Sequence, residues 1–223
     1  MSDPFQDIDV AGPQFATYVA DVMDRRQNDP IMERLPSALL IAEAETRGKS
    51  RPNLTFAQAD GASIPLPDHS ARSVIMHTVL SHVSDPEPLI AEAFRLLEPG
   101  GCFIICDGDF SKGTLRSIAN DPLGACSDEF IDSFVTHPHL IGQIQRLLPE
   151  AGFSVDSFEA ASRLVTSEGM KPWVEMSTNA MVARGEIGQE LADALLAEHA
   201  RRVELGSIYG YQVFVTLIAS RPK

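Results

Sequence analysis

The chain has 223 residues, of which 44% are hydrophobic and 22% are charged, and its formal net charge is −13. This length and composition suffice for a globular fold with a sizeable core. The acidic balance argues against nucleic acid or an anionic membrane as the main partner, because both bind clusters of Lys and Arg. No apolar run approaches transmembrane length and the first residues, MSDPFQDIDV, are unlike a signal peptide, so we expect a cytoplasmic protein.

Two helices are predicted in the first fifty residues. Pro13–Arg26 is amphipathic, with one apolar stripe; its members are Phe15, Tyr18, Val19, Val22 and Met23. Ser37–Arg47 has a Ser at its N-cap and is followed by Gly48, the residue type that most often ends a helix.

The central stretch, residues 53–109, has the pattern of a strand–helix–strand unit. A strand over Asn53–Ala59 meets the turn Asp60-Gly61, and Ser73–Val79 is a short apolar run typical of a buried strand. Asp85-Pro86 opens a helix that we expect Gly100-Gly101 to end, and the next strand is CFIIC at 102–106. Parallel units of this kind predict an α/β sheet with helices on both faces.

The C-terminal part predicts further helices and two more strands. Ile131–Leu148 is helical but interrupted by Pro138 and Gly142, and a strand follows near Ser154–Ala160. A helix over 188–205 carries Leu191, Leu195 and Val203 on its apolar side, and Val213–Ser220 is the last strand. We expect one domain over 1–223.

Between these last two strands lies a segment, about 161–207, that contains the only Trp of the chain, Trp173, and several Met residues. Two interpretations stay open. The segment is a lid over a hydrophobic substrate, or it is a helical satellite with a small core of its own.

Four short pieces in this order resemble the class I S-adenosylmethionine (SAM) methyltransferases, in particular the type 11, ubiquinone/menaquinone-biosynthesis branch. The pieces are Asp60-Gly61-Ala62, then IPLPD at 64–68, VLSHV at 79–83 and LLEPGG at 96–101. The tail Val213–Ser220 fits the last strand of that family. The resemblance implies a Rossmann-like methyltransferase sheet whose last strand is antiparallel.

The sequence departs from the family before residue 53. The family has a Gly-rich loop after its first strand and an acidic residue after its second. The glycines let the backbone approach the cofactor, and the acid holds the ribose hydroxyls. Here only Gly12 and Gly48 precede residue 53, and Leu35 stands where the acid is expected. We therefore predict a truncated sheet that lacks its first two strands, with a junction at Leu35/Pro36 that is a natural deletion, an engineered one or a gap in the sequence itself.

The resemblance also implies which residues contact SAM. Asp60 would accept a hydrogen bond from the adenine amino group, and the backbone at Gly61 and Ala62 would face the ring. His77 and Thr78 end the following strand, at the sheet edge where ligands of α/β proteins bind. The alternative for Asp60 is a turn residue that stabilises its own loop.

Candidate catalytic residues follow the same strand ends. His82 or His77 has the pKa range of a general base, although many methyl transfers need only a held geometry. Asp107 and Asp109 follow CFIIC and are candidates for a base, for a contact to a cationic substrate or for a solvated turn; we expect no metal there. Tyr211 is a further candidate, near the acceptor.

Two functions remain open at this stage. The first is a SAM-dependent methyltransferase that acts on a small, partly hydrophobic molecule. The second is a non-catalytic or repurposed protein of the same fold, as a binding or scaffold protein or a SAM-independent enzyme. In either case a domain-swapped homodimer would complete a sheet that lacks strands.

Overall fold

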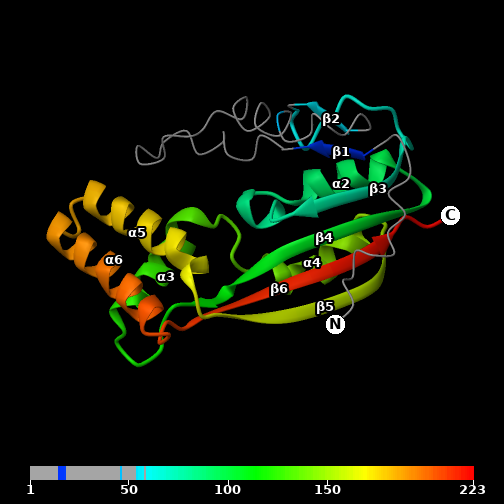
Figure 1. Ribbon diagram of the computed structural model, residues 1–223. Helices are drawn as coiled ribbons and strands as arrows, with labels where there is room; N and C mark the ends of the chain where they lie inside the picture. Colours follow the sequence, from blue (N-terminus) through cyan, green and yellow to red (C-terminus); the bar gives the residue numbers. More distant parts are fainter. Residues whose placement is uncertain (1–14, 19–45, 47–53, 58) are drawn as a thin grey trace. The chain divides into compact units, whose positions relative to one another are not determined.

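The structure is a computed structural model that describes residues 15–18, 46, 54–57 and 59–223 (Figure 1). The chain divides into two compact units, Met1–Leu66 and Pro67–Lys223, which are described separately below. The predicted junction at Leu35/Pro36 lies outside the described residues, and so does the predicted helix Ser37–Arg47 apart from Thr46, which is helical.

The first unit contains a two-stranded parallel ladder. Strand β1 (Phe15–Tyr18) pairs with β2 (Leu54–Ala57) in a regular register, with Phe15 opposite Leu54. The predicted helix over Pro13–Arg26 is therefore wrong at Phe15–Tyr18, and its remaining residues are not described. Periodicity misleads here because FATY also has the aromatic and β-branched composition of a strand, and a run this short fits both periods.

The second unit is built on a four-stranded sheet in the order β3-β4-β6-β5. Strands β3 (Ala71–His77) and β4 (Leu97–Thr114) are parallel. The last strand, β6 (Gly210–Ser220), is antiparallel to both β4 and β5 (Ser154–Val165). The sheet confirms the predicted α/β class, the parallel strand–helix–strand unit and the antiparallel last strand.

Two helices, α2 (Glu87–Leu96) and α4 (Leu140–Glu150), each contact β4 and also contact one another, so they cover the same face of the sheet. Aromatic rings contribute to the contact with the sheet. The centroid of the Phe153 ring, which follows α4, lies 5.1 Å from that of Phe94 in α2 and 5.2 Å from that of Phe103 in β4. Phe103 is fully buried.

Helix α2 ends earlier than the sequence predicts. It stops at Leu96, because Leu97 is extended and pairs with Ala71 at the start of β4. Gly100-Gly101 therefore lies inside the strand and does not end the helix. Gly100 has φ +82°, a left-handed conformation that favours glycine. A side chain at Gly101 would meet the Arg72 carbonyl oxygen of β3 at 3.0 Å, so glycine there allows the two strands to approach.

Three helices gather at one end of the sheet, on the left in Figure 1. They are α3 (Pro122–Phe134), α5 (Lys171–Ala183) and α6 (Gln189–Glu204). The single interrupted helix predicted over Ile131–Leu148 is in fact two, α3 and α4. The break at 135–139 contains Pro138 as predicted, but Gly142 lies inside α4. A one-turn 3-10 helix, η2 (Glu168–Met170), leads into α5.

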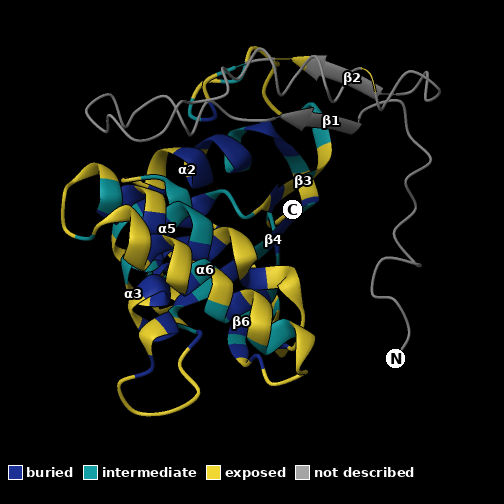
Figure 2. Ribbon diagram, turned by 60° about the vertical axis from the view of Figure 1, so that its left-hand side comes forward, coloured by how far each residue is buried: buried dark blue, intermediate teal, exposed yellow. Residues whose placement is uncertain are grey.

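Helix α6 buries Leu195 as predicted and half-buries Val203, but its buried face does not include Leu191. Its buried residues are Ala192, Leu195 and His199, whereas Leu191 is 51% exposed. The buried set is spaced i, i+3, i+7, which fits one helical face, and Leu191 lies outside it. Figure 2 shows exposed residues along the outer sides of α5 and α6.

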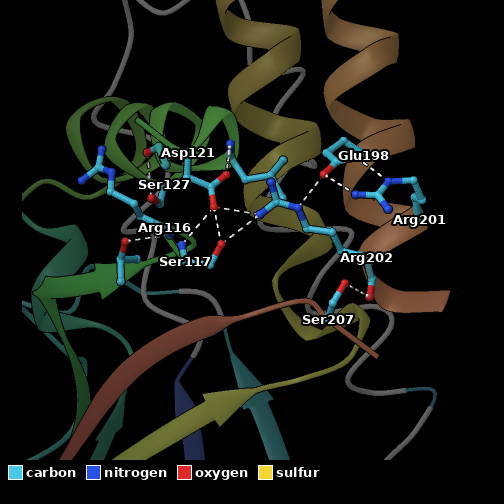
Figure 3. A network of polar contacts seen from close by, with 11 residues as sticks. Arg116, Ser117, Asp121, Ser127, Glu198, Arg201, Arg202 and Ser207 are labelled. Carbon is cyan, nitrogen blue, oxygen red and sulfur yellow. Dashed lines mark hydrogen bonds and ion pairs between the residues drawn. The ribbon is translucent and has the colours of Figure 1, made fainter. Parts of the chain in front are cut away.

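A polar network connects this helical group (Figure 3). Asp121 caps α3 by accepting from the Leu123 N–H at 3.1 Å, and its other oxygen accepts from Arg202 of α6 at 2.7 Å and from the Ser117 hydroxyl at 2.6 Å. Arg202 also donates to Glu198 at 2.6 Å. The Asp121 side chain is fully buried, so α6 is fixed to the start of α3 by a buried ion pair.

The three cysteines, Cys102, Cys106 and Cys126, are free thiols. Burial raises the pKa of the Cys126 thiol to about 11, with a further contribution from Asp121. A protonated, buried thiol is a small apolar group rather than a nucleophile. Within the described part of the chain, no helix is long and apolar enough to cross a membrane.

Candidate functional site

The backbone is strained where β3 ends. Thr78, directly after His77, has φ 53°, a left-handed conformation that β-branched residues rarely adopt. Two hydrogen bonds stabilise it, because the Thr78 N–H donates to the Cys106 carbonyl at 2.8 Å and its hydroxyl lies 2.9 Å from His77 Nδ1. Strain of this kind, about 1–3 kcal/mol, is concentrated at binding and catalytic sites.

Asp107 fixes the turn that follows. It accepts hydrogen bonds from the Ser81 N–H at 3.1 Å, the Ser81 hydroxyl at 2.7 Å and the Gly108 N–H at 2.8 Å, and it is fully buried. Ser81 belongs to a 3-10 turn, η1 (Leu80–His82). Asp107 therefore positions the turn that carries His82.

Asp107 and Asp109 were predicted to follow a strand, and this part of the prediction is wrong, because both lie inside β4. Pairing with β3 ends at Cys106, but β6 continues alongside, with Asp107 opposite Val215 and Asp109 opposite Val213. The second neighbouring strand keeps the chain extended beyond the end of the parallel pair. Asp109 is half-buried and accepts from the Ser111 hydroxyl at 2.5 Å.

His82 is held by two elements. Its Nδ1 lies 3.2 Å from the carbonyl oxygen of Phe134 in α3, and its ring meets Phe110 of β4 edge to face at 5.6 Å. A carbonyl oxygen only accepts, so Nδ1 carries the proton of the neutral ring and the basic lone pair lies on Nε2. This is the tautomer that a general base at Nε2 requires.

An aromatic cluster lies next to His82. Phe110 stacks on Trp173 of α5 at 6.0 Å, Trp173 stacks on Phe130 at 4.4 Å, and Phe130 stacks on Phe134 at 5.6 Å. The sequence analysis singled out Trp173 but missed its partners. Phe130 and Phe134, four apart on one helix, were the available signal.

In the first unit, Asp60 forms a compact turn. Its side chain accepts from the Ala62 N–H at 3.0 Å, and its carbonyl accepts from the Ser63 N–H at 2.9 Å. Gly61 between them is buried. The geometry is that of an Asp stabilising its own loop, and a role in adenine recognition stays a prediction.

The predicted residues thus fall into three groups. His77, Thr78, His82 and Asp107 are linked at the end of β3 by the contacts above. Tyr211 lies opposite Thr114, four residues along β6 from the partner of Asp107, which is about 13 Å of extended chain. Asp60, Gly61 and Ala62 belong to the other unit. No cluster of three or more His, Cys, Asp or Glu side chains able to hold a metal occurs among the residues described.

Comparison with known proteins relates one segment of the chain to methyltransferases. Residues 30–105 match the model of a family described as methyltransferase domain. This segment includes β2, β3, α2 and the first half of β4. This segment of the chain is therefore similar to a methyltransferase domain. A demethylmenaquinone methyltransferase of Tropheryma whipplei is 31% identical over 142 residues, 56% of this chain and 58% of the relative, which supports the predicted resemblance.

Two further matches support the methyltransferase domain. A protein of Mycolicibacterium smegmatis named "Probable S-adenosylmethionine-dependent methyltransferase" is 29% identical over 108 residues, 47% of this chain and 37% of that protein. A crystal structure of a Bacillus halodurans protein, proposed to be a methyltransferase, superposes with a TM-score of 0.53 at 15% identity over 84% of this chain and 80% of the other, which shows a shared fold. The chain spans well under two thirds of the length of these curated relatives.

Proposed function

We propose that the protein is a SAM-dependent methyltransferase that acts on a small, partly hydrophobic molecule. The observation that carries the proposal is the strained Thr78 turn at the carboxyl end of β3, which lies within the segment matched to the methyltransferase family. Ligands of open α/β sheets bind at this edge. The T. whipplei relative is named for a quinone-type acceptor, which supports a small-molecule substrate here.

In this proposal SAM supplies an electrophilic methyl group, and the chain's own residues orient the reactants. Asp60 and the backbone at Gly61 and Ala62 are assigned to adenine, and His77 and Thr78 to the cofactor side of β3. His82 Nε2 takes a proton from the acceptor where the acceptor needs one. Asp107 holds the His82 turn rather than reacting, because its oxygens already accept three hydrogen bonds.

The aromatic cluster of Phe110, Phe130, Phe134 and Trp173 supports an apolar acceptor. Its position next to His82 favours the lid interpretation of residues 161–207 over a separate satellite. The four rings are buried against one another, and an apolar environment of this kind beside a base suits the in-line transfer of a methyl group, since such transfer depends mainly on holding the two reactants in line. A single domain, a homodimer and a cytoplasmic location stay predictions.

A second function has its own supporting observation. The sequence before residue 53 lacks the family's Gly-rich loop, and the Asp60 carboxylate already accepts from Ala62 in its own turn. These two facts favour a methyltransferase-fold protein that binds no SAM.

Calorimetric titration of the full chain with SAM separates the two. We expect binding in the micromolar range, and Asp60→Ala is expected to weaken it about 10- to 100-fold, as for a hydrogen bond to a charged group. The matched control is Asp85→Ala, because the Asp85 carboxylate makes the same contact to a backbone N–H two residues on, Glu87 at 3.1 Å. No heat at millimolar SAM would overturn the methyltransferase proposal, and equal affinities of the two variants would remove Asp60 from the site.

A further inference from the structure

Strand β5 forms one edge of the four-stranded sheet (Figure 1). Among the described strands, only β6 pairs with it, so its other side presents unpaired N–H and C=O groups. An edge of this kind is a template for another strand unless it is short, bulged, proline-containing or protected by charge. β5 has 12 residues and no proline.

The central part of this edge is regular and exposed. The register with β6 shifts between Val155 and Ser157, and from Ser157 to Val165 it continues without interruption. Side chains from Phe158 to Leu164 are all exposed on both faces of the strand. Two of them are large and apolar, Phe158 at 36% and Leu164 at 61% exposure.

The sequence of this regular stretch is complementary to itself. In an antiparallel pair of two copies centred on Ala161, Glu159 of each copy stands opposite Arg163 of the other. In the same register, Phe158 of each copy stands opposite Leu164 of the other. The charged pairs fall on one face of the joined sheet and the apolar pairs on the opposite face, because successive side chains alternate.

Other registers lose this match. The backbone groups that point outward belong to alternate residues, and these residues must face one another in the pair. The two-fold axis of a symmetric pair therefore lies at a residue, and the neighbouring registers are centred one residue to either side. Centring on Ala160 places Leu164 opposite Asp156, and centring on Ser162 places Glu159 opposite Val165. Only the Ala161 register pairs opposite charges and apolar side chains together.

Both charged residues are available for this pairing. Within the part of the chain that the structure describes, neither Glu159 nor Arg163 forms an ion pair, and both are exposed. Charges normally protect an edge strand by repelling a second copy. Here their opposite signs at symmetric positions attract instead.

We propose that β5 is the interface of a two-fold homodimer, in which two copies of the chain pair their β5 edges antiparallel about Ala161 and form one continuous eight-stranded sheet. The nine-residue ladder would add about eight to ten backbone hydrogen bonds. Such an isologous contact repeats each pair twice, so complementary pairs are doubled. The inference concerns an interaction surface and does not depend on the proposed methyl transfer.

The experiment is analytical ultracentrifugation of the full chain and of charge variants over a concentration series. The wild type is expected to sediment as a dimer, at twice the chain mass of 24.3 kDa. Glu159→Arg and Arg163→Glu each place like charges opposite one another twice, and we expect each to raise the dimer dissociation constant at least about tenfold. The double variant E159R/R163E restores opposite charges and is expected to recover the wild-type constant.

The matched control is Glu204→Arg, which makes the same change of charge at an exposed position at the end of α6. It should leave the dimer intact. A wild type that stays monomeric at about 100 µM, a concentration that populates even weak dimers, would overturn the proposal. So would a dimer that single charge reversals do not weaken, because its interface would then lie elsewhere, or a double variant that stays as weak as the single ones.

Discussion

Asp107 is a buried carboxylate whose two oxygens are both occupied by the turn after β3. Sequence alone places it among candidate bases, because it follows an apolar run. The three hydrogen bonds from Ser81 and Gly108 instead make it the residue that holds η1. A buried group with several donors is costly to change, since any replacement must satisfy each of them.

We therefore predict that Asp107→Asn destabilises the chain. Asn has one acceptor oxygen, and its NH₂ group would face a backbone or hydroxyl donor, which leaves a buried donor unsatisfied at a cost of about 1–3 kcal/mol. For a chain of this size the melting temperature should fall by roughly 3–10 °C. Differential scanning calorimetry measures it.

Asp109→Asn is the control for this variant. Asp109 lies two residues further along the same strand, is half-buried and accepts one hydrogen bond, from the Ser111 hydroxyl, which an amide oxygen can also accept. Its melting temperature should change by no more than a degree or two. Equal shifts in the two variants would contradict the positioning role of Asp107.

Among the helices, the contact between α6 and the start of α3 depends on one ion pair. The side chain of Asp121 is 0% exposed and that of Arg202 is 12% exposed. Burial by itself would raise the pKa of Asp121, but hydrogen bonds from Arg202 and Ser117 outweigh it and hold the pKa well below its usual range. Removing one partner of such a pair leaves a buried charge without compensation.

Arg202→Met should lower the free energy of unfolding by about 3 kcal/mol. Arg201→Met is the control, because Arg201 is 57% exposed and, among the described residues, pairs with Glu198 alone, so its loss should cost less than about 1 kcal/mol. Urea unfolding followed by Trp173 fluorescence measures both. Similar losses in the two variants would show that burial does not set the strength of this pair.

The same ion pair predicts a pH dependence. Because the folded-state pKa of Asp121 is depressed, the unfolded chain takes up a proton near pH 4 that the folded chain does not. The stabilisation is therefore complete above that pH and is lost as the pH falls below it. In Arg202→Met the loss of stability between pH 5 and 3 should be smaller than in the wild type, as measured by urea unfolding at each pH.

At the scale of the whole molecule, the second unit has a core of its own. Fully buried side chains come from its strands and helices alike, including Leu97, Phe103 and Leu217. We predict that residues 67–223, expressed alone, unfold cooperatively. Trp173 is 7% exposed and is the only Trp of the chain, so its fluorescence reports this core directly. A fragment without a cooperative transition, while the full chain shows one, would contradict the prediction.

Local pattern determined much of this second unit. The apolar runs at β3 and β4, the Asp85-Pro86 helix start and the tail strand were all recognisable, because buried parallel strands and amphipathic helices leave strong short-range signals. Four short pieces at the right spacing also indicated the methyltransferase family. These features depend on residues close together in sequence.

Only the tertiary structure decided the rest, because the deciding contacts join residues far apart in sequence. Pairing with β6 keeps Asp107 inside β4. Pairing of Leu97 with Ala71 ends α2 at Leu96, before the Gly100-Gly101 pair that was predicted to end it. The β2 ladder makes Phe15–Tyr18 a strand rather than a helix. Among the described strands, β5 lies at the edge of its sheet because β6, the last of them, pairs between β4 and β5, and no local periodicity encodes that order.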